Sequence, residues 1–165
     1  MPRFFSLSGN STKDDCKALE AAVGRMPELL QSETERTWPR IPTMLKGQDA
    51  IALVAEESGF CAGFCKAHYN DTGISAVIDI LYVMPDFRQR GLGRTLLMRI
   101  ENMSAARGAT IIRFPTATDP ACAHLAVNAG YTVEAAESVS CTSIKLATTH
   151  AVVFRKTLSA AAGEM

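Results

Sequence analysis

The chain has 165 residues, of which 47% are hydrophobic and 21% are charged, and this length and composition fit one globular domain. Its 17 lysine and arginine residues balance 17 aspartate and glutamate residues, which argues against nucleic acid or an anionic membrane as a partner. Without a long apolar segment at the N-terminus or elsewhere, the chain is expected to be soluble and cytoplasmic.

The cysteines are odd in number and scattered, which argues against a disulfide framework and fits a reducing compartment. Two of them, Cys61 and Cys65, are close in sequence but lack a second ligand pair, so we expect no metal site.

The first part of the chain predicts a strand and two helices. Residues 3–7 have strand character, and apolar residues recur at helical spacing over 12–26 before Pro27. The segment 27–47 predicts a further helix followed by an irregular loop.

The middle of the chain predicts a hairpin and a central strand. Residues 51–56 and 60–67 flank the turn 57–59, which favours an antiparallel pair. The long apolar run 74–83 is typical of a buried central strand, and Pro85 ends it.

The last part of the chain alternates helices and strands. The strongest helical pattern covers 91–107, and a strand at 110–114 follows it. A short helix is expected at 120–129, an extended segment at 131–134 and a last strand at 152–156. This order predicts a single α+β (mixed α/β) domain over residues 1–158 with a frayed tail from 159 to 165.

The segment 83–97 joins the central strand to the strongest helix through a basic turn that contains glycine. A helix N-terminus presents unpaired N–H groups and the positive end of the helix dipole, so it favours an anion. Gly91 and Gly93 lack a β-carbon, which lets phosphate oxygens approach their amides. Positive charge is added by three arginines: Arg88, Arg90 and Arg94.

Two common phosphate motifs do not match this turn. The Gly-Lys-Ser/Thr ending of a Walker loop is absent, and Leu96 stands where the dinucleotide fingerprint needs its third glycine. The pattern Arg88-x-x-Gly91-x-Gly93, five residues after Val83, instead resembles the acyl-CoA pyrophosphate loop of the GCN5-related N-acetyltransferase (GNAT) superfamily.

This resemblance implies a central mixed, mostly antiparallel twisted sheet of about six to seven strands flanked by about four helices. It also implies that acyl-CoA lies where the central strand splays from its neighbour, with its pantetheine arm on the main chain of Leu81 and Val83 and its pyrophosphate on the amides from Gln89 to Thr95. The cofactor-binding residues expected from it are Leu81, Tyr82, Val83, Arg88, Gln89, Arg90, Gly91, Leu92, Gly93, Arg94, Thr95 and Asp119.

A second family segment is only partly matched. Aligned on Gly130-Tyr131, the chain has Asp119 for the usual asparagine, Cys122 for the alanine and Ala126 for the tyrosine whose hydroxyl protonates the leaving thiolate in similar enzymes. Cys122 lies within one helical turn of Ala126 and is therefore a candidate acid. A structural thiol at this position, with water as the proton donor, is the alternative.

The candidate base is Asp79, the only carboxylate inside the central apolar strand. Strand alternation predicts that it shares a face with Val77, Leu81 and Val83, where a carboxylate needs a partner or a function. A structural ion pair with an arginine, or exposure to solvent, is the alternative. For His68, after the third strand, the alternatives are a residue that lines an acceptor cleft and a histidine at the surface, of which the second is expected.

The expected function is an acetyl-CoA-dependent N-acyltransferase that moves an acetyl group directly to an amine of a small molecule or peptide in a ternary complex. A non-catalytic acyl-CoA-binding or partner-binding module and a nucleotide-binding protein are the alternatives. The sequence does not identify the acceptor, and a homodimer through edge strands or the tail is compatible with it.

Overall fold

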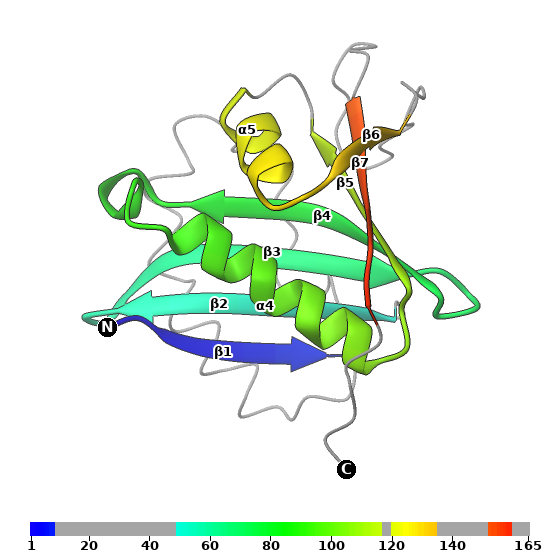
Figure 1. The fold of residues 1–165 in the computed structure, drawn as a ribbon. Helices are drawn as coiled ribbons and strands as arrows, with labels where there is room; N and C mark the ends of the chain where they lie inside the picture. The colour runs from blue at the N-terminus through cyan, green and yellow to red at the C-terminus, as the bar shows by residue number, and fades with distance from the viewer. Residues whose placement is uncertain (9–48, 117–119, 135–151, 160–165) are drawn as a thin grey trace, which may run out of the picture.

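The computed structural model describes residues 1–8, 49–116, 120–134 and 152–159. Within these ranges seven strands form one sheet, accompanied by two α-helices and one 3₁₀ turn (Figure 1). In chain order the elements are β1 (Arg3–Ser8), β2 (Ala50–Glu57), β3 (Phe60–Tyr69), β4 (Ser75–Val83), η1 (Pro85–Phe87), α4 (Leu92–Ala106), β5 (Ile111–Thr116), α5 (Pro120–Asn128), β6 (Thr132–Glu134) and β7 (Val152–Thr157). The strands expected in these ranges are confirmed, whereas the two helices expected between 12 and 47 lie outside the described residues.

The sheet has the order β1-β2-β3-β4-β5-β7-β6, so the last strand of the chain lies between β5 and β6. β4 and β5 pair in parallel, and the other neighbouring strands pair antiparallel. β2 and β3 are joined at Ser58 and Gly59, which have φ of 56° and 82°, the left-handed backbone that a tight hairpin requires. The sheet confirms the expected mixed, mostly antiparallel α+β fold.

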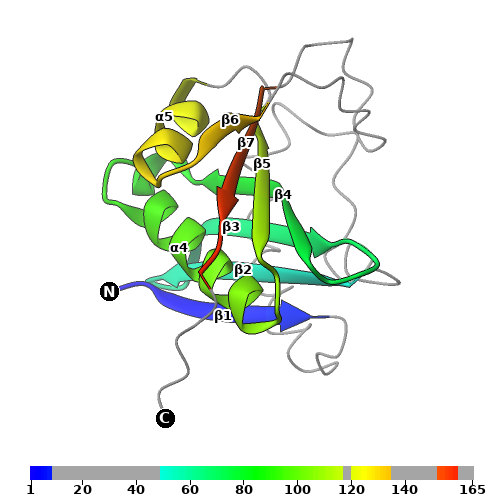
Figure 2. The same cartoon turned by 45° about the vertical axis from the view of Figure 1, so that its right-hand side comes forward.

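β4 leaves β5 after a short contact. Its pairing with β5 covers only 75–77, opposite 111–113, whereas its pairing with β3 continues to Val83. From residue 78 onward the other edge of β4 therefore has no strand beside it among the described residues, and Figure 2 shows the two strands diverging. The prediction of a fully buried central strand is therefore wrong for its second half. The residues from Asp79 to Val83 are half-buried or exposed.

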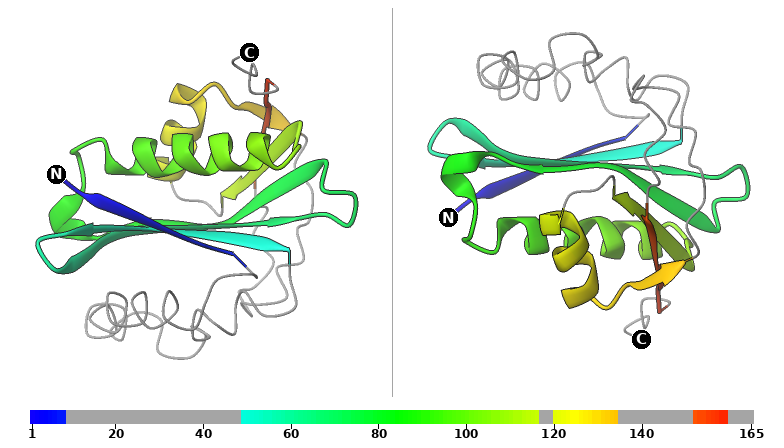
Figure 3. Two further views of the ribbon diagram at one scale, coloured as in Figure 1. Left: turned by 90° about the horizontal axis from the view of Figure 1, so that it is seen from below. Right: turned by 90° about the horizontal axis from the view of Figure 1, so that it is seen from above.

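Helix α4 packs along one face of the sheet, and α5 contacts the same core (Figure 3). Gly63 of β3 lies beneath α4, where a β-carbon would be 2.9 Å from Leu96 Cδ1 and 3.0 Å from Tyr82 O. A glycine at this position therefore lets the helix approach the sheet closely. The apolar residues that α4 buries form one stripe along the helix: Leu92, Leu96, Leu97 and Ile100. None of the helices in the described ranges is long and apolar enough to cross a bilayer.

Buried polar contacts fasten the C-terminal half of α4. Ser104 Oγ lies 3.2 Å from Tyr69 Oη, and Lys156 Nζ of β7 donates to Glu101 Oε2 at 2.7 Å. Lys156 Nζ is also 5.6 Å from the ring centroid of Tyr131. Burial and the neighbouring Glu101 carboxylate raise the pKa of Tyr131, so its hydroxyl stays protonated in the core.

We expect Leu97→Ala to lower the free energy of unfolding by about 2–5 kcal/mol, because Leu97 is fully buried between α4 and the sheet. Its neighbour Met98 is 52% exposed and provides the control, with an expected change within about 0.5 kcal/mol for Met98→Ala. Urea unfolding followed by circular dichroism measures both, and equal losses in the two variants would contradict the packing of this helix.

Candidate functional site

The free edge of β4 presents backbone groups to the opening between β4 and β5. The Met84 N–H donates to Ala62 O of β3 at 3.0 Å, and successive residues of a strand direct their backbone groups to opposite sides. Val83 and Leu81 therefore direct their N–H and C=O groups away from β3, into the opening. An extended ligand along this edge can form hydrogen bonds with them as an added strand does.

The turn after β4 ends at an uncapped helix N-terminus. Gln89 and Gly91 have φ of 60° and 76°, and Gly91, the N-cap residue of α4, offers no side-chain cap. Amides 92–94 have no acceptor within the helix, so they are available to an anion. Thr95 was expected to contribute its amide as well, but its N–H and its hydroxyl both donate to Gly91 O, at 3.0 and 3.2 Å.

Gly93 lies where the helix start meets both sides of the opening. A β-carbon there would lie 3.4 Å from Leu125 Cδ2 of α5 and 3.6 Å from Val83 Cγ2 of β4. The side chain of Leu92 points into the core, so only its backbone is available to a ligand. The expected loop residues thus meet the strand edge and α5 at one place.

Arg88 folds back over the end of β4. Its Nε donates to Val83 O at 2.9 Å, and its guanidinium carbon is 5.6 Å from the ring centroid of Tyr82. The Val83 carbonyl is therefore not used in the sheet, which agrees with its direction into the opening. A ligand that pairs with this carbonyl must displace Arg88 or share the oxygen with it.

The other two arginines of the turn differ in their partners. Arg90 Nη1 is 3.9 Å from Glu57 Oε2, across the turn that joins β2 and β3. Arg94 is exposed and forms no ion pair with any residue in the described ranges. Its charge, next to amides 92–94, adds to the attraction of this helix end for an anion.

Helix α5 carries the positions of the second family segment. Ala126 is fully buried in the main core, so the residue in the tyrosine position has neither a hydroxyl nor access to solvent. Cys122 is half-buried and packs against the same core, and Asp119 lies outside the described residues. The buried hydroxyl of Tyr131 is not a substitute, because it faces the Glu101 side of the core.

A β-bulge in β4 changes the direction of the candidate base. Lys66 of β3 is opposite Ile80, but the next residue, Ala67, is opposite Ile78. Asp79 is therefore the extra residue of the bulge.

The expectation that Asp79 shares a face with Leu81 and Val83 is wrong for this reason. The bulge shifts the alternation by one residue, so Leu81 and Val83 pack against the core beneath α4. The Asp79 carboxylate lies on the other face, beside Lys66.

Asp79 joins two basic side chains of β3. Its Oδ2 is 3.2 Å from Lys66 Nζ, and its Oδ1 is 2.7 Å from His68 Nδ1. The Lys66 side chain is only 9% exposed, whereas those of Asp79 and His68 are 28% and 39% exposed. His68 is opposite Val77, the last residue of β4 that pairs with β5, so this cluster lies level with the vertex of the opening along the sheet, one strand away from it across β4.

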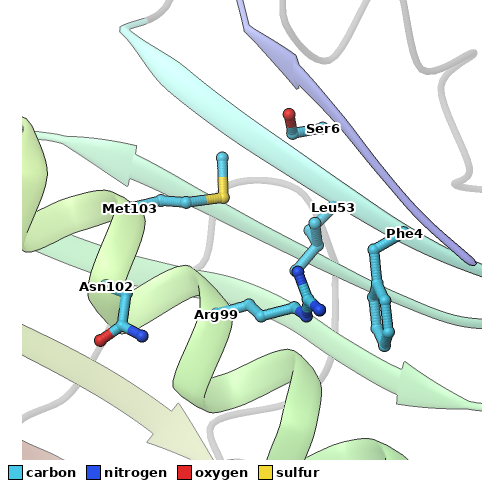
Figure 4. Close-up of a pocket in the computed structure, with 6 residues that line it drawn as sticks. All are labelled: Phe4, Ser6, Leu53, Arg99, Asn102 and Met103. Atoms are coloured by element: carbon cyan, nitrogen blue, oxygen red, sulfur yellow. The ribbon is translucent and has the colours of Figure 1, made fainter.

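A separate shallow hollow of about 230 Å³ lies at the other edge of the sheet, between β1, β2 and α4 (Figure 4). The Arg99 guanidinium carbon is 4.1 Å from the ring centroid of Phe4 there. The hollow is lined by Phe4, Ser6, Leu53, Arg99, Asn102 and Met103. It contains none of the expected site residues.

The described residues contain no group of three His, Cys, Asp or Glu side chains placed to hold a metal ion. Cys61 and Cys65 are both buried. Burial raises the pKa of Cys61 to about 11 and raises that of Cys65 further, so both stay as core thiols.

A strand edge that opens within the sheet and leads to a glycine turn at a helix N-terminus can hold an extended ligand with an anionic end. This is the arrangement that the resemblance to acyl-CoA-dependent acyltransferases implied. The model of the Acetyltransferase (GNAT) family matches residues 18–131, and the chain belongs to this family. Membership confirms the expected class and the acyl-CoA cosubstrate that goes with it.

Solved structures share the fold at low sequence identity. The ribosomal-protein-S18-alanine N-acetyltransferase from Escherichia coli is 18% identical with a TM-score of 0.68, and the match covers 100% of this chain and 99% of that one. The PaiA N-acetyltransferase from Thermoplasma acidophilum in complex with coenzyme A is 15% identical with a TM-score of 0.64, over 95% and 99% of the two chains.

A tandem GNAT protein from the clavulanic acid biosynthesis pathway is 21% identical with a TM-score of 0.62. The match covers 82% of this chain but only 45% of the tandem protein. No curated protein sequence matches the chain significantly.

Sequence reasoning missed one member of this cluster, Lys66, to which it assigned nothing. For His68 it preferred the surface to an acceptor cleft. The pattern did contain a clue, since Lys66 and His68 alternate with Cys65 and Ala67 and so lie on one face of β3. What the pattern lacked was the bulge that brings Asp79 to the same face.

We expect Gly91→Asp to weaken binding of acetyl-CoA at least tenfold, because it places a carboxylate at the anion-binding helix end. Gly108→Asp is the matched control, since Gly108 also has a positive φ, 97°, and open space around it, but lies at the other end of α4. Isothermal titration measures the affinity of both variants for acetyl-CoA. Because both substitutions strain a backbone with positive φ, a difference between them reports the charge placed at the N-terminus of α4. Equal affinities would show that the anion binds elsewhere.

Proposed function

We propose that the protein is an acetyl-CoA-dependent N-acetyltransferase that transfers the acetyl group directly to a primary amine in a ternary complex. The observation that carries the proposal is the free edge of β4, which runs into the uncapped N-terminus of α4. The pantetheine arm would pair with the backbone at Leu81 and Val83, and the pyrophosphate would lie on amides 92–94.

Direct transfer needs the amine and the thioester held together, with groups that stabilise the charge that develops. Binding in the opening brings the two reactants into one complex, and backbone N–H groups of β4 would polarise the thioester carbonyl. The attacking nitrogen must also lose a proton. Of the described residues, Asp79 and His68 are the titratable groups at the vertex of the opening that suit this task.

The acceptor is proposed to be a primary amine of a small molecule or a peptide. Two proteins with the same fold are named for N-acetylation, one of them for the alanine of ribosomal protein S18. The scattered cysteines favour the cytoplasm as the place of action.

A non-catalytic acyl-CoA-binding module is the second candidate, and one observation favours it. Ala126 is fully buried in the position where similar enzymes carry their acid tyrosine, so this proton donor is missing. The two candidates share the cofactor and differ only in turnover.

Isothermal titration with acetyl-CoA should give saturable binding to one site, whereas ATP and NAD should bind far more weakly because the turn lacks their motifs. Release of CoA is then measured with spermidine, kanamycin, amino-acid amides and a tetrapeptide that begins with alanine. Turnover with any of these amines supports the transferase over the binding module. Failure of the folded protein to bind acetyl-CoA would overturn both candidates.

Cys122→Ala tests whether the thiol replaces the missing tyrosine. We expect kcat to stay within a few-fold of the original value, for two reasons. The thiolate of CoA is a good leaving group, and the Cys122 side chain packs against the core. Steady-state rates with the most active amine of the panel give the answer. A fall of about 100-fold, as for loss of a general acid, would assign Cys122 that role.

A further inference from the structure

Both carboxylate oxygens of Asp79 are already engaged. Oδ1 faces His68 Nδ1 at 2.7 Å, and Oδ2 faces Lys66 Nζ at 3.2 Å. To take a proton from the amine, the carboxylate would have to give up one of these contacts. Asp79 is therefore poorly placed to be the base itself.

The buried position of Lys66 gives a second reason. Its side chain is 9% exposed, so its ammonium depends on a nearby negative charge. Protonation of Asp79 would remove that charge, whereas protonation of His68 would add a cation that the same carboxylate stabilises. The cluster therefore favours a proton on the imidazole over one on the carboxylate.

The hydrogen bond to Asp79 also selects the tautomer of His68. An ionised carboxylate only accepts hydrogen bonds, so Nδ1 must carry the proton of the neutral ring. Nε2 is then unprotonated and can accept a proton. The side chain is 39% exposed, which leaves the ring accessible to an amine or to a water between them.

On the described strands beside β3, the positions opposite His68 carry no charge. The residues opposite His68 on its two neighbouring strands are Ala50 of β2 and Val77 of β4. Beyond Val77 the nearest charged residue in register on the described strands is Arg113, which is bonded to Glu134 and Ser75. Among the described residues, the charged groups that the structure places beside His68 are therefore Asp79 and, through it, Lys66.

The position of His68 along β4 fits the expected course of the cosubstrate. The pyrophosphate site lies beyond Val83, and the strand edge from Val83 back to Asp79 spans about 13 Å. An extended pantetheine arm along this edge runs toward the vertex, where His68 is opposite Val77. The thioester end and the imidazole thus come level with each other along β4, and the exposed ring would reach the acceptor amine over the face of this strand, directly or through a water.

We propose that His68 is the catalytic base and that Asp79 is the residue that positions it, with Lys66 keeping Asp79 ionised. This inference rests on the proposed function. The acceptor ammonium loses one proton to Nε2, and its nitrogen attacks the thioester carbon. The C–S bond then breaks, and the leaving thiolate receives the second proton of the nitrogen to give CoA-SH. The imidazolium finally returns its proton to solvent.

The kinetic test compares His68→Ala and Asp79→Asn, with His124→Ala, an exposed histidine of α5, as control. With the most active amine of the panel, kcat should fall about 10²–10⁴-fold in His68→Ala, as expected for loss of a general base. Added imidazole should restore part of that rate, and acetyl-CoA affinity should be unchanged. The rising limb of the pH profile should disappear in this variant. In Asp79→Asn we expect a smaller loss of kcat than in His68→Ala, because the imidazole remains but loses the partner that orients it.

Two kinetic outcomes would overturn the inference: a His68→Ala variant as active as His124→Ala, or an Asp79→Asn variant that loses more activity than His68→Ala. The second outcome would make Asp79 the base. If the original protein turns over and the variants show either pattern, the proposed function stands and only this inference fails. If the protein does not bind acetyl-CoA, both the proposed function and this inference are overturned.

A spectroscopic test needs no acceptor. Long-range ¹H–¹⁵N correlation spectra of histidine-labelled protein should show His68 with its proton on Nδ1, and Asp79→Asn should weaken this preference. A proton on Nε2 in the original protein would contradict the proposed dyad.

Discussion

The parallel contact between β4 and β5 ends after Val77, and the rest of the site depends on this early ending. Beyond it, β4 keeps β3 on one side and exposes backbone groups on the other, so an extended ligand can take the place of a neighbouring strand. The same strand then passes through the turn with Gly91 to an uncapped helix end, which suits an anion. The divergence of β4 from β5 thus places the free backbone edge of β4 in line with the uncapped N-terminus of α4.

The vertex of this opening is also where charge is concentrated on the face opposite α4. A buried ammonium, Lys66, requires a negative partner, and the bulge at Asp79 supplies one. The second oxygen of that carboxylate then fixes the tautomer of His68. The Asp79 side chain therefore does two things: it neutralises Lys66, and it orients the imidazole of His68. This shared role is the basis for proposing His68, and not Asp79, as the base.

Local patterns were enough to predict the described elements, because helices and strands have their own periods. The stripe of α4, its end at Gly108 and the hairpin at Ser58 and Gly59 each depend on neighbouring residues alone. The turn proposed to bind phosphate could be found for the same reason, since its arginines and glycines are adjacent in sequence, and its role stays a prediction. The described ranges contain two α-helices, and the other helices expected from the family lie outside them.

The class of fold and the family could be predicted from the sequence alone, since both follow from patterns in short stretches of chain, whereas the anion-binding role of the turn stays a prediction. The face of Asp79 and its two partners could not be predicted, because they depend on how β4 pairs with β3. Strand alternation predicted the wrong face because a bulge is set by the register against β3, which no single strand encodes. Likewise, the meeting of Lys66 and His68 with Asp79 depends on strand pairing that joins residues more than ten positions apart in sequence.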